Sequence, residues 1–156
     1  SGDYKGAEDT YNEALDIQTS RLKLNRKSDP DYAHMLNNLA SLYMVSGRTD
    51  KAKELLEESL SIYQSKFGSD HLSTATAQSD LGQVYLYEGN LADAADMLES
   101  SHVTKLTKLG ADHPKTVESK QNLAVLAWQR NEIDTAKIYF SEVLESSLGF
   151  INEFFP

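Results

Sequence analysis

The stretch Leu36-Asn37-Asn38-Leu39-Ala40-Ser41-Leu42-Tyr43 contains a Leu-Ala pair that recurs along the chain at a constant interval. Leu39-Ala40 is followed by Leu81-Gly82 and then by Leu123-Ala124, each 42 residues after the pair before it. The same interval joins Tyr43 to Tyr85, Gly47 to Gly89, and Ala52 to Ala94 and Ala136. An internal period of this length is typical of a stack of similar units. The sequence therefore predicts a repeat array with a long surface, and none of its repeating residues is chemically reactive.

Each unit is predicted to consist of two helices, most clearly between residues 29 and 68. Asp29-Pro30 is a helix-start signal, because proline at the first helical position gives up an N–H group that has no partner there. Gly47 and Gly68 are expected to end the two helices, because glycine adopts the left-handed conformation at little cost. Apolar or small residues recur at helical spacing: Leu36, Leu39, Ala40 and Tyr43 in the first helix, and Ala52, Leu55, Leu56, Ser59, Leu60, Tyr63 and Phe67 in the second. The pattern predicts an all-α fold.

The next two units keep this plan with local changes. They begin at Asp70-His71 and Asp112-His113-Pro114, and the third unit has Asn131 in place of the turn glycine. Asparagine is the usual second choice for the left-handed conformation. In the second unit, His102 and Lys105 take the places of apolar side chains, so the packing stripe of its second helix is weaker.

The period divides the chain into a truncated unit, three full units and a short tail. The boundaries are 1–28 for the second helix of a truncated unit, 29–69, 70–111 and 112–149 for the full units, and 150–156 for an apolar tail or the start of a further helix. A basic segment at residues 21–27 precedes the first full unit. We expect a solvated helix end there, which suits the helix dipole, with a binding patch as the alternative.

From the character of its two ends, we expect the chain to be a fragment of a longer protein. The segment Phe150–Pro156 is apolar, whereas repeat arrays need a polar terminal helix to stay soluble. The parent protein is therefore expected to continue, or the tail packs on the last groove or on a second copy. The chain also starts at Ser1 without a methionine. Targeting information can have been cut away with the missing part.

Composition limits the partners of this chain. Acidic residues number 24 against 15 basic ones, which gives a formal charge of −9 and disfavours duplex nucleic acid and anionic membranes. A basic partner is favoured, although the charge can also serve only solubility. The longest apolar run, Leu123–Trp128, is too short to span a membrane. There is no cysteine, which is compatible with a reducing compartment, and we predict a cytoplasmic location.

The repeated motif resembles the tetratricopeptide repeat, whose pattern is W-x2-L-G-x2-Y followed by A-x3-F. The three copies are Leu36-x2-Leu39-Ala40-x2-Tyr43 with Ala52-x3-Leu56, Gln78-x2-Leu81-Gly82-x2-Tyr85 with Ala94-x3-Leu98, and Lys120-x2-Leu123-Ala124-x2-Ala127 with Ala136-x3-Phe140. The 42-residue period, the LNNLASLY stretch and the joints Phe67-Gly68-Ser69-Asp70-His71 and Leu109-Gly110-Ala111-Asp112-His113-Pro114 resemble the kinesin light chain type of this repeat. That type occurs in many scaffold, signalling and bacterial proteins.

The resemblance implies a right-handed superhelical solenoid of antiparallel helix pairs, in which the first helix of each pair lines a concave groove. Such grooves commonly hold an extended peptide of a partner protein, and the resemblance implies no cofactor and no chemistry. The side chains opposite the packing stripe would then face the groove. They are His34, Asn37, Asn38 and Ser41, then Thr76, Ser79, Asp80 and Gln83, and then Glu118, Gln121, Asn122 and Val125.

Amide side chains are the best candidates for peptide contacts, because they donate and accept hydrogen bonds together. Asn38 and Asn122 lie at matching positions, with hydrogen bonding between helices of the stack as the alternative role. Some family members grip a carboxylate with lysine or arginine in this groove, but this chain offers neither there. Asp80 and Glu118 add negative charge instead, so we expect a neutral or basic peptide.

Apolar side chains near the ends of the lining helices are candidate anchors for such a peptide. They are Met44, Leu86, Tyr87 and Trp128. The alternative is that they belong to the core between units, because an aromatic residue at helical spacing usually packs.

An enzyme is not expected from the residues present. His71 and His113 occupy equivalent helix starts about 10 Å apart, judged from the spacing of packed helices, so they cannot share a metal ion. His34 has no nucleophile nearby, and His102 lies on the packing stripe. No Gly-rich phosphate loop is present. The sequence therefore predicts no catalytic residue and no metal site.

Two functions remain open at this stage. The array can be an adaptor or scaffold whose groove binds a partner peptide. It can also be a structural spacer or a self-association module, with a homodimer formed through the apolar C-terminal end.

Overall fold

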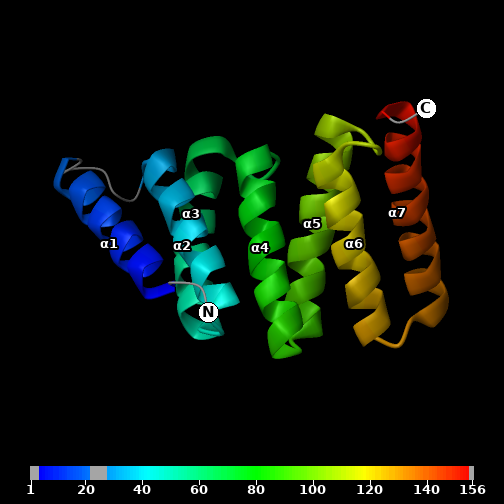
Figure 1. Ribbon diagram of the computed structural model, residues 1–156, viewed down its shortest axis with the longest axis horizontal. Coiled ribbons are helices and arrows are strands. Elements are labelled where there is room, and N and C mark those ends of the chain that lie inside the picture. The colour runs from blue at the N-terminus through cyan, green and yellow to red at the C-terminus, as the bar shows by residue number, and fades with distance from the viewer. Residues whose placement is uncertain (1–3, 22–27, 155–156) are drawn as a thin grey trace.

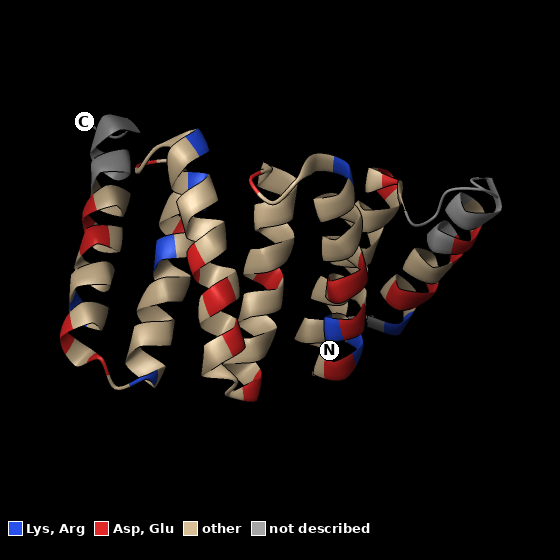
Figure 2. Cartoon of the chain, turned by 180° about the vertical axis from the view of Figure 1, so that it is seen from behind, with Lys and Arg blue, Asp and Glu red and all other residues tan. Residues whose placement is uncertain are grey.

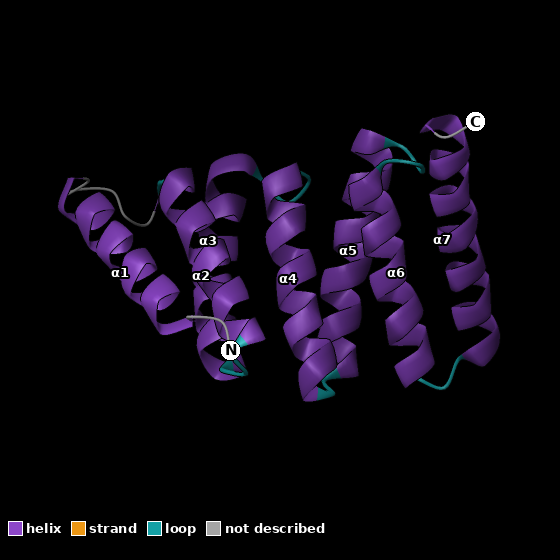
Figure 3. Cartoon of the chain, in the orientation of Figure 1, coloured by secondary structure: helices purple, strands orange, loops and turns teal. Residues whose placement is uncertain are grey.

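The computed structural model describes residues 4–21 and 28–154, which form seven α-helices and no strand (Figure 1; Figure 3). The helices are α1 (Tyr4–Arg21), α2 (Pro30–Val45), α3 (Thr49–Phe67), α4 (Leu72–Glu88), α5 (Leu91–Leu109), α6 (Pro114–Gln129) and α7 (Ile133–Phe154). The principal contacts join α2 to α3, α4 to α5 and α6 to α7, and each pair also packs on the next. This arrangement confirms the prediction of an all-α helical repeat array.

The three first helices of the pairs begin at side chains that cap them. Asp29 accepts a hydrogen bond from the Asp31 N–H at 2.9 Å, which satisfies one of the unpaired donors of the first turn. His71 does the same for α4 through Nδ1 and the Ser73 N–H at 3.1 Å. His113 caps α6 in the same way. The histidines of the Asp-His joints therefore have a structural role at the helix starts.

The turns inside the pairs require positive φ angles. Gly89 ends α4 in the left-handed conformation with φ of 75°, and Asn131 follows α6 with φ of 62°. Asn131 is the only non-glycine residue with positive φ among the described residues. The prediction that asparagine replaces the turn glycine in the third unit is therefore confirmed.

A small residue at one repeated position lets the two helices of a pair approach closely. Ala40 and Ala124 are completely buried there. At Gly82 in the middle pair, a Cβ atom would lie 2.7 Å from the Leu98 side chain of α5. Even a methyl group would therefore require Leu98 to move.

The predicted packing stripes form the core. Leu36, Leu39, Leu56 and Tyr63 are all buried. Phe67, the last residue of the second stripe, is instead partly exposed and stacks on His71, with ring centroids 4.3 Å apart. The two stripes of the first full unit therefore pack as predicted except at this joint.

Two buried hydroxyl groups fasten the helices of the first and second pairs. Ser59 donates to the Ala33 carbonyl at 2.9 Å, and Ser101 donates to the Ala75 carbonyl at 2.6 Å. Both serines are completely buried. These bonds join the second helix of a pair to the backbone of its first helix.

The joints between successive pairs use different chemistry at matching positions. Glu8 of α1 forms an ion pair with Arg48 at 2.8 Å and accepts a hydrogen bond from the Tyr43 hydroxyl at 2.9 Å. Lys53 of α3 pairs with Glu88 at 3.0 Å and lies over the Tyr85 ring. Each joint therefore combines a charge pair with the tyrosine of the following unit.

The ends of the chain lie partly outside the described residues. These exclude 1–3, 22–27 and 155–156, so most of the basic segment is not described. Helix α7 runs on through Phe154, so residues 150–154 belong to this helix. The expected repeat boundaries remain a proposal. Among the described residues, no helix is both long and apolar enough to cross a membrane.

The array has an inner and an outer side. Helix α2 contacts α4, and α4 contacts α6, whereas the second helices α3, α5 and α7 make no comparable contact with one another. An array whose helices lie closer together on one side curves toward that side. We therefore call the surface of α2, α4 and α6 that is turned away from α3, α5 and α7 the inner face.

Candidate functional site

Polar side chains connect the helices of the inner face. Asn37 of α2 donates through Nδ2 to Asp80 Oδ2 of α4 at 3.4 Å. One unit further on, Asn122 of α6 donates through Nδ2 to Ser79 Oγ of α4 at 3.3 Å. Asn37 and Ser79 occupy matching positions in the repeat, as do Asp80 and Asn122. The two bonds therefore repeat along the array.

A first pocket, the Asp80 pocket, lies between α2 and α4 and measures about 210 Å³. It has an apolar side and a polar side. Its lining residues are Met44, Val45 and Leu56 on the apolar side, and Ser41, Asp80 and Gln83 on the polar side.

A second pocket, the Asn37 pocket, measures about 200 Å³ and lies toward the N-terminal ends of the same two helices. Its lining residues are His34, Asn37, Tyr63, Leu72, Ser73, Thr76 and Lys115. Asn37 contributes a buried carbonyl oxygen, Oδ1, that has no hydrogen-bond partner among the described residues. This acceptor is closed to solvent, so a ligand in the pocket can reach it only if neighbouring side chains move.

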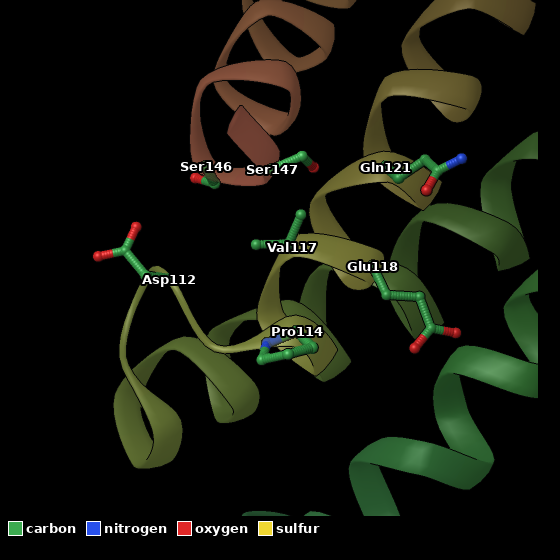
Figure 4. Close-up of a pocket in the computed structure, with 7 residues that line it drawn as sticks. All are labelled: Asp112, Pro114, Val117, Glu118, Gln121, Ser146 and Ser147. Carbon is green, nitrogen blue, oxygen red and sulfur yellow. The ribbon is translucent and has the colours of Figure 1, made fainter. Parts of the chain in front are cut away.

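A third pocket, the α6–α7 pocket, measures about 400 Å³. Figure 4 shows Val117 between Pro114 and the serines of α7, with Glu118 and Gln121 extending away from Asp112. Its lining residues are Asp112, Pro114, Val117, Glu118, Gln121, Ser146 and Ser147.

An unusual group of charges lies at the centre of the array. Burial raises the pKa of Asp80 to about 6, an effect that Lys105 opposes and Glu118 strengthens. Lys105 of α5 is only 3% exposed, and this burial lowers its pKa, while Glu118 and Asp80 act in the opposite direction. No ion pair involves Asp80 or Lys105 among the described residues. The three charges therefore interact at longer range.

His102 is a second departure in the middle pair. Its Nδ1 lies 2.8 Å from Ser119 Oγ of α6. Burial lowers the pKa of His102, as do the nearby Lys120 and Lys105, while Glu142 acts in the opposite direction. His102 is therefore a polar contact between pairs at a position where Leu60 makes an apolar one.

The structure brings eight of the thirteen predicted groove residues to a pocket, six to the two pockets between α2 and α4 and two to the α6–α7 pocket. Five of the predicted residues line none of the three pockets, namely Asn38, Ser79, Asn122, Val125 and Trp128. Asn122 bonds to α4, which is the alternative role predicted for it. Asn38 is half-buried, and its side chain makes no hydrogen bond to another described residue. Ser79 is buried, because the first helices of neighbouring pairs contact each other at this position.

The four candidate apolar anchors divide into two groups. Met44 packs against the core and lines the Asp80 pocket, and Leu86 is buried in the core between pairs. Tyr87 and Trp128 are 72% and 61% exposed. The core explanation therefore holds for Leu86 and in part for Met44, and it fails for Tyr87 and Trp128.

Two features of the molecule go beyond what the sequence indicates. The sequence marks Lys105 as a break in the stripe, but its burial next to Asp80 depends on three helices that meet only in the fold. The other feature is an exposed apolar stripe on α7, formed by Phe140, Leu144 and Leu148. Leu60, the counterpart of Leu144, is 8% exposed, whereas Leu144 is 62% exposed. The 42-residue period could have revealed the exposure of Leu144, because its counterpart Leu60 is covered by the next pair, whereas no further described helix covers α7.

Charge is distributed along the whole array. Figure 2 shows acidic residues on helices from one end of the described chain to the other. Within the described part of the chain, no group of three or more histidine, aspartate or glutamate side chains is placed to hold a metal ion.

Stacked antiparallel helix pairs with a pocketed inner face define a class, the helical repeat proteins. Residues 31–102 match the family model described as tetratricopeptide repeat. The crystal structure of BtubC (BKLC) from P. vanneervenii matches with 27% identity and a TM-score of 0.80, over 95% of this chain and 57% of that one. This chain therefore spans little more than half the length of BtubC. No curated protein sequence matches it.

Two further structures come from Podosopora anserina and contain nearly identical TPR-like repeats assigned to a putative kinesin light chain. The first has 23% identity and a TM-score of 0.74, over 96% of this chain and 69% of that one. The second has 23% identity and a TM-score of 0.71, over 94% and 68%. At this identity the likeness concerns the fold alone. Residues 31–102 therefore match the tetratricopeptide repeat, a repeat that is typical of protein-interaction modules.

Proposed function

We propose that the inner face binds an extended peptide of a partner protein, so that the array acts as an adaptor or scaffold. The observation that carries this proposal is the pair of neighbouring pockets between α2 and α4. Six of the predicted groove residues line them: His34, Asn37 and Thr76 in the Asn37 pocket, and Ser41, Asp80 and Gln83 in the Asp80 pocket. A peptide that crosses the inner face can place side chains in both pockets.

The expected partner is a neutral or basic peptide. Asp80 and Glu118 lie on the inner face, and the chain carries a formal charge of −9. The amide of Asn38 can both donate a hydrogen bond to a peptide and accept one from it. This role requires no cofactor and no catalysis, and we place it in the cytoplasm.

A decapeptide library tests the proposal, with the native chain immobilised and the retained peptides sequenced. The double variant His34→Ala/Asn38→Ala removes two side chains of the inner face that make no hydrogen bond to another described residue. Gln64→Ala removes an exposed amide from α3 and serves as the matched control. We expect the double variant to lose most retained peptides and Gln64→Ala to keep them. Peptides that bind all three chains equally would contradict a site on the inner face.

The exposed stripe on α7 favours a second function, association through the C-terminal end. The counterparts of Phe140 and Leu144 on α3, namely Leu56 and Leu60, are buried against the following pair, whereas the α7 stripe is open. The proposed partner of this stripe is a second copy of the chain, and analytical ultracentrifugation can test this association directly. We expect Leu144→Glu to abolish any rise of mass with concentration, and a mass that rises equally in the variant would exclude this stripe as the contact.

A further inference from the structure

The Asp80 pocket has the chemistry of a site for one particular side chain. Met44, Val45 and Leu56 provide an apolar wall, and Asp80 is the only lining residue that carries a charge. A long side chain with an aliphatic stem and a cationic end matches this division, because such side chains bury their stem and keep the charge on a polar partner.

We propose that the Asp80 pocket is a specificity site for a lysine side chain of the peptide bound on the inner face. This inference rests on the proposed peptide-binding function and adds the residue that the peptide must carry. The ammonium group has three donors. Three residues that carry acceptor atoms line the polar side of the pocket, namely Asp80, Gln83 and Ser41.

These three acceptors are available in the structure. Asp80 Oδ2 accepts the bond from Asn37, and Oδ1 is left without a partner among the described residues. The Gln83 amide makes no hydrogen bond to another described residue. Ser41 Oγ donates to the Asn37 carbonyl at 3.1 Å and keeps its capacity to accept.

The same geometry favours lysine over arginine. A guanidinium group binds a carboxylate best through two parallel hydrogen bonds, which require both oxygen atoms. Asn37 already donates to Oδ2 of Asp80, so a bidentate fork would have to share this oxygen with Asn37. The compact ammonium group needs only one carboxylate oxygen, and it suits one charged group among neutral polar neighbours.

The matching positions between α4 and α6 lack this chemistry. Asn122 stands there in place of Asp80, and Val125 stands in place of Gln83. At these matching positions, a carboxylate is therefore present only at the seam between α2 and α4. Lysine selection is expected at one place along the peptide.

Acid should weaken lysine binding at this site. Burial raises the pKa of Asp80 to about 6, and a bound ammonium group requires the ionised carboxylate. The groups facing Asp80 are Asn37 from α2, Tyr63 from α3, Lys105 from α5 and Glu118 from α6. At pH 7, one unit above this pKa, the Asp80 carboxyl group is ionised in about ten elevenths of the molecules. At pH 5, one unit below it, the ionised fraction is about one eleventh. Affinity for a lysine peptide is therefore expected to fall about tenfold from pH 7 to pH 5.

The test uses the decapeptide library and two variants of equal charge. Asp80→Asn places at this position the residue that Asn38 and Asn122 supply in the other pairs, so the fold is expected to tolerate it. Asp96→Asn removes an exposed carboxylate from α5 as the matched control. A peptide selected by the native chain is then synthesised with lysine, norleucine, acetyl-lysine or arginine at the selected position.

We expect the native chain to select lysine at one position and to prefer it to norleucine by about tenfold or more at pH 7. Asp80→Asn should lose this preference and its pH dependence, whereas Asp96→Asn should keep both. Gln83→Val, which copies Val125 of the third unit, should lose part of the preference and leave the norleucine peptide unaffected. Circular dichroism confirms that each variant is folded.

The outcomes separate this inference from the function on which it rests. Peptides retained without a fixed lysine, or a lysine preference that survives in Asp80→Asn, would overturn the lysine site and leave peptide binding standing. An equal preference for arginine would overturn the choice of the ammonium group. A native chain that retains no peptide would overturn both proposals.

Discussion

The first and second full helix pairs have the same backbone plan but different side chains at three matching positions. Asn38, Leu60 and Tyr63 of the first pair correspond to Asp80, His102 and Lys105 of the second. Leu60 and Tyr63 are buried apolar contacts, whereas His102 and Lys105 bring polar or charged groups into the same places.

The difference separates the positions that form the fold from the positions that give a unit its own chemistry. Leu56 and Leu98 are 2% and 1% exposed, and Ser59 and Ser101 make the same buried bond in both pairs. The fold therefore tolerates a buried lysine at position 105, provided that the shared positions keep their packing.

The shared apolar positions should contribute equally to stability in the two pairs. Leu56→Ala and Leu98→Ala each leave a cavity in a fully buried place, so each is expected to reduce the free energy of unfolding by about 3 kcal/mol. Urea unfolding followed by circular dichroism measures both. Phe140→Ala at the matching place of α7, where 36% of the residue is exposed, should cost less. A large difference between the two leucines would show that the charges of the second pair weaken its core.

The pH dependence of stability should distinguish the second pair from the first. The pKa of Asp80 is raised to about 6 in the folded chain, against about 3.9 in the unfolded chain, so the folded chain binds more protons between these values. The free energy of unfolding should therefore fall by about 2 kcal/mol as the pH rises from 4 to 6.

Asp80→Asn isolates this contribution, because all other titrating groups are common to both chains. His102 acts in the opposite direction, since its lowered pKa gives stability that is lost as the pH falls through the folded value. The measurement is the free energy of unfolding at each pH, compared between the native chain and Asp80→Asn. Parallel curves from pH 4 to 7 would mean that burial of Asp80 does not perturb its titration.

The fold was predictable from the sequence because its signals are local or periodic. Asp29, His71 and His113 start helices, and Asn131 takes the left-handed turn, each for reasons that act within a few residues. The 42-residue period then places every unit against the next. No long-range pairing had to be guessed, since each pair packs mainly on its neighbours.

The site was less predictable, because its chemistry arises where several helices meet. The predicted groove residues His34 and Ser41 line the two pockets between α2 and α4. Helical spacing could not show that Asn122 would bond to Ser79, or that Lys105 would be buried and would act electrostatically on Asp80. Such contacts depend on the angles and offsets between helices, which the period alone does not fix.

A double-mutant cycle sharpens the role of the buried lysine. Lys105→Met keeps the apolar stem and removes the nearby positive charge, which leaves Asp80 and Glu118 uncompensated. At pH 7 this variant is expected to lose about 1–2 kcal/mol of stability. The double variant Lys105→Met/Asp80→Asn should regain most of the loss, because one of the two uncompensated charges is gone. Strictly additive effects in urea unfolding would show that the two groups do not interact.

The smallest expected difference concerns the buried serines, where the two pairs are most alike. Ser59→Ala and Ser101→Ala each remove one hydrogen bond to a backbone carbonyl, that of Ala33 or Ala75. Each carbonyl lies inside a helix and can keep its backbone bond, so the expected loss is about 1 kcal/mol in both cases. Ser147→Ala on exposed α7 serves as the control and should change stability by less than about 0.5 kcal/mol.

The third pair lacks this buried serine. Val143 stands at the position of Ser59 and Ser101, and it is only half-buried. Equal losses in Ser59→Ala and Ser101→Ala would mean that the polar substitutions of the second pair leave its helix-to-helix contact intact. A loss confined to Ser59→Ala would mean that Lys105 and His102 have already loosened the contact between α4 and α5. In that case the special chemistry of the second pair would extend through the whole pair, and the division between fold-forming and specific positions would not hold there.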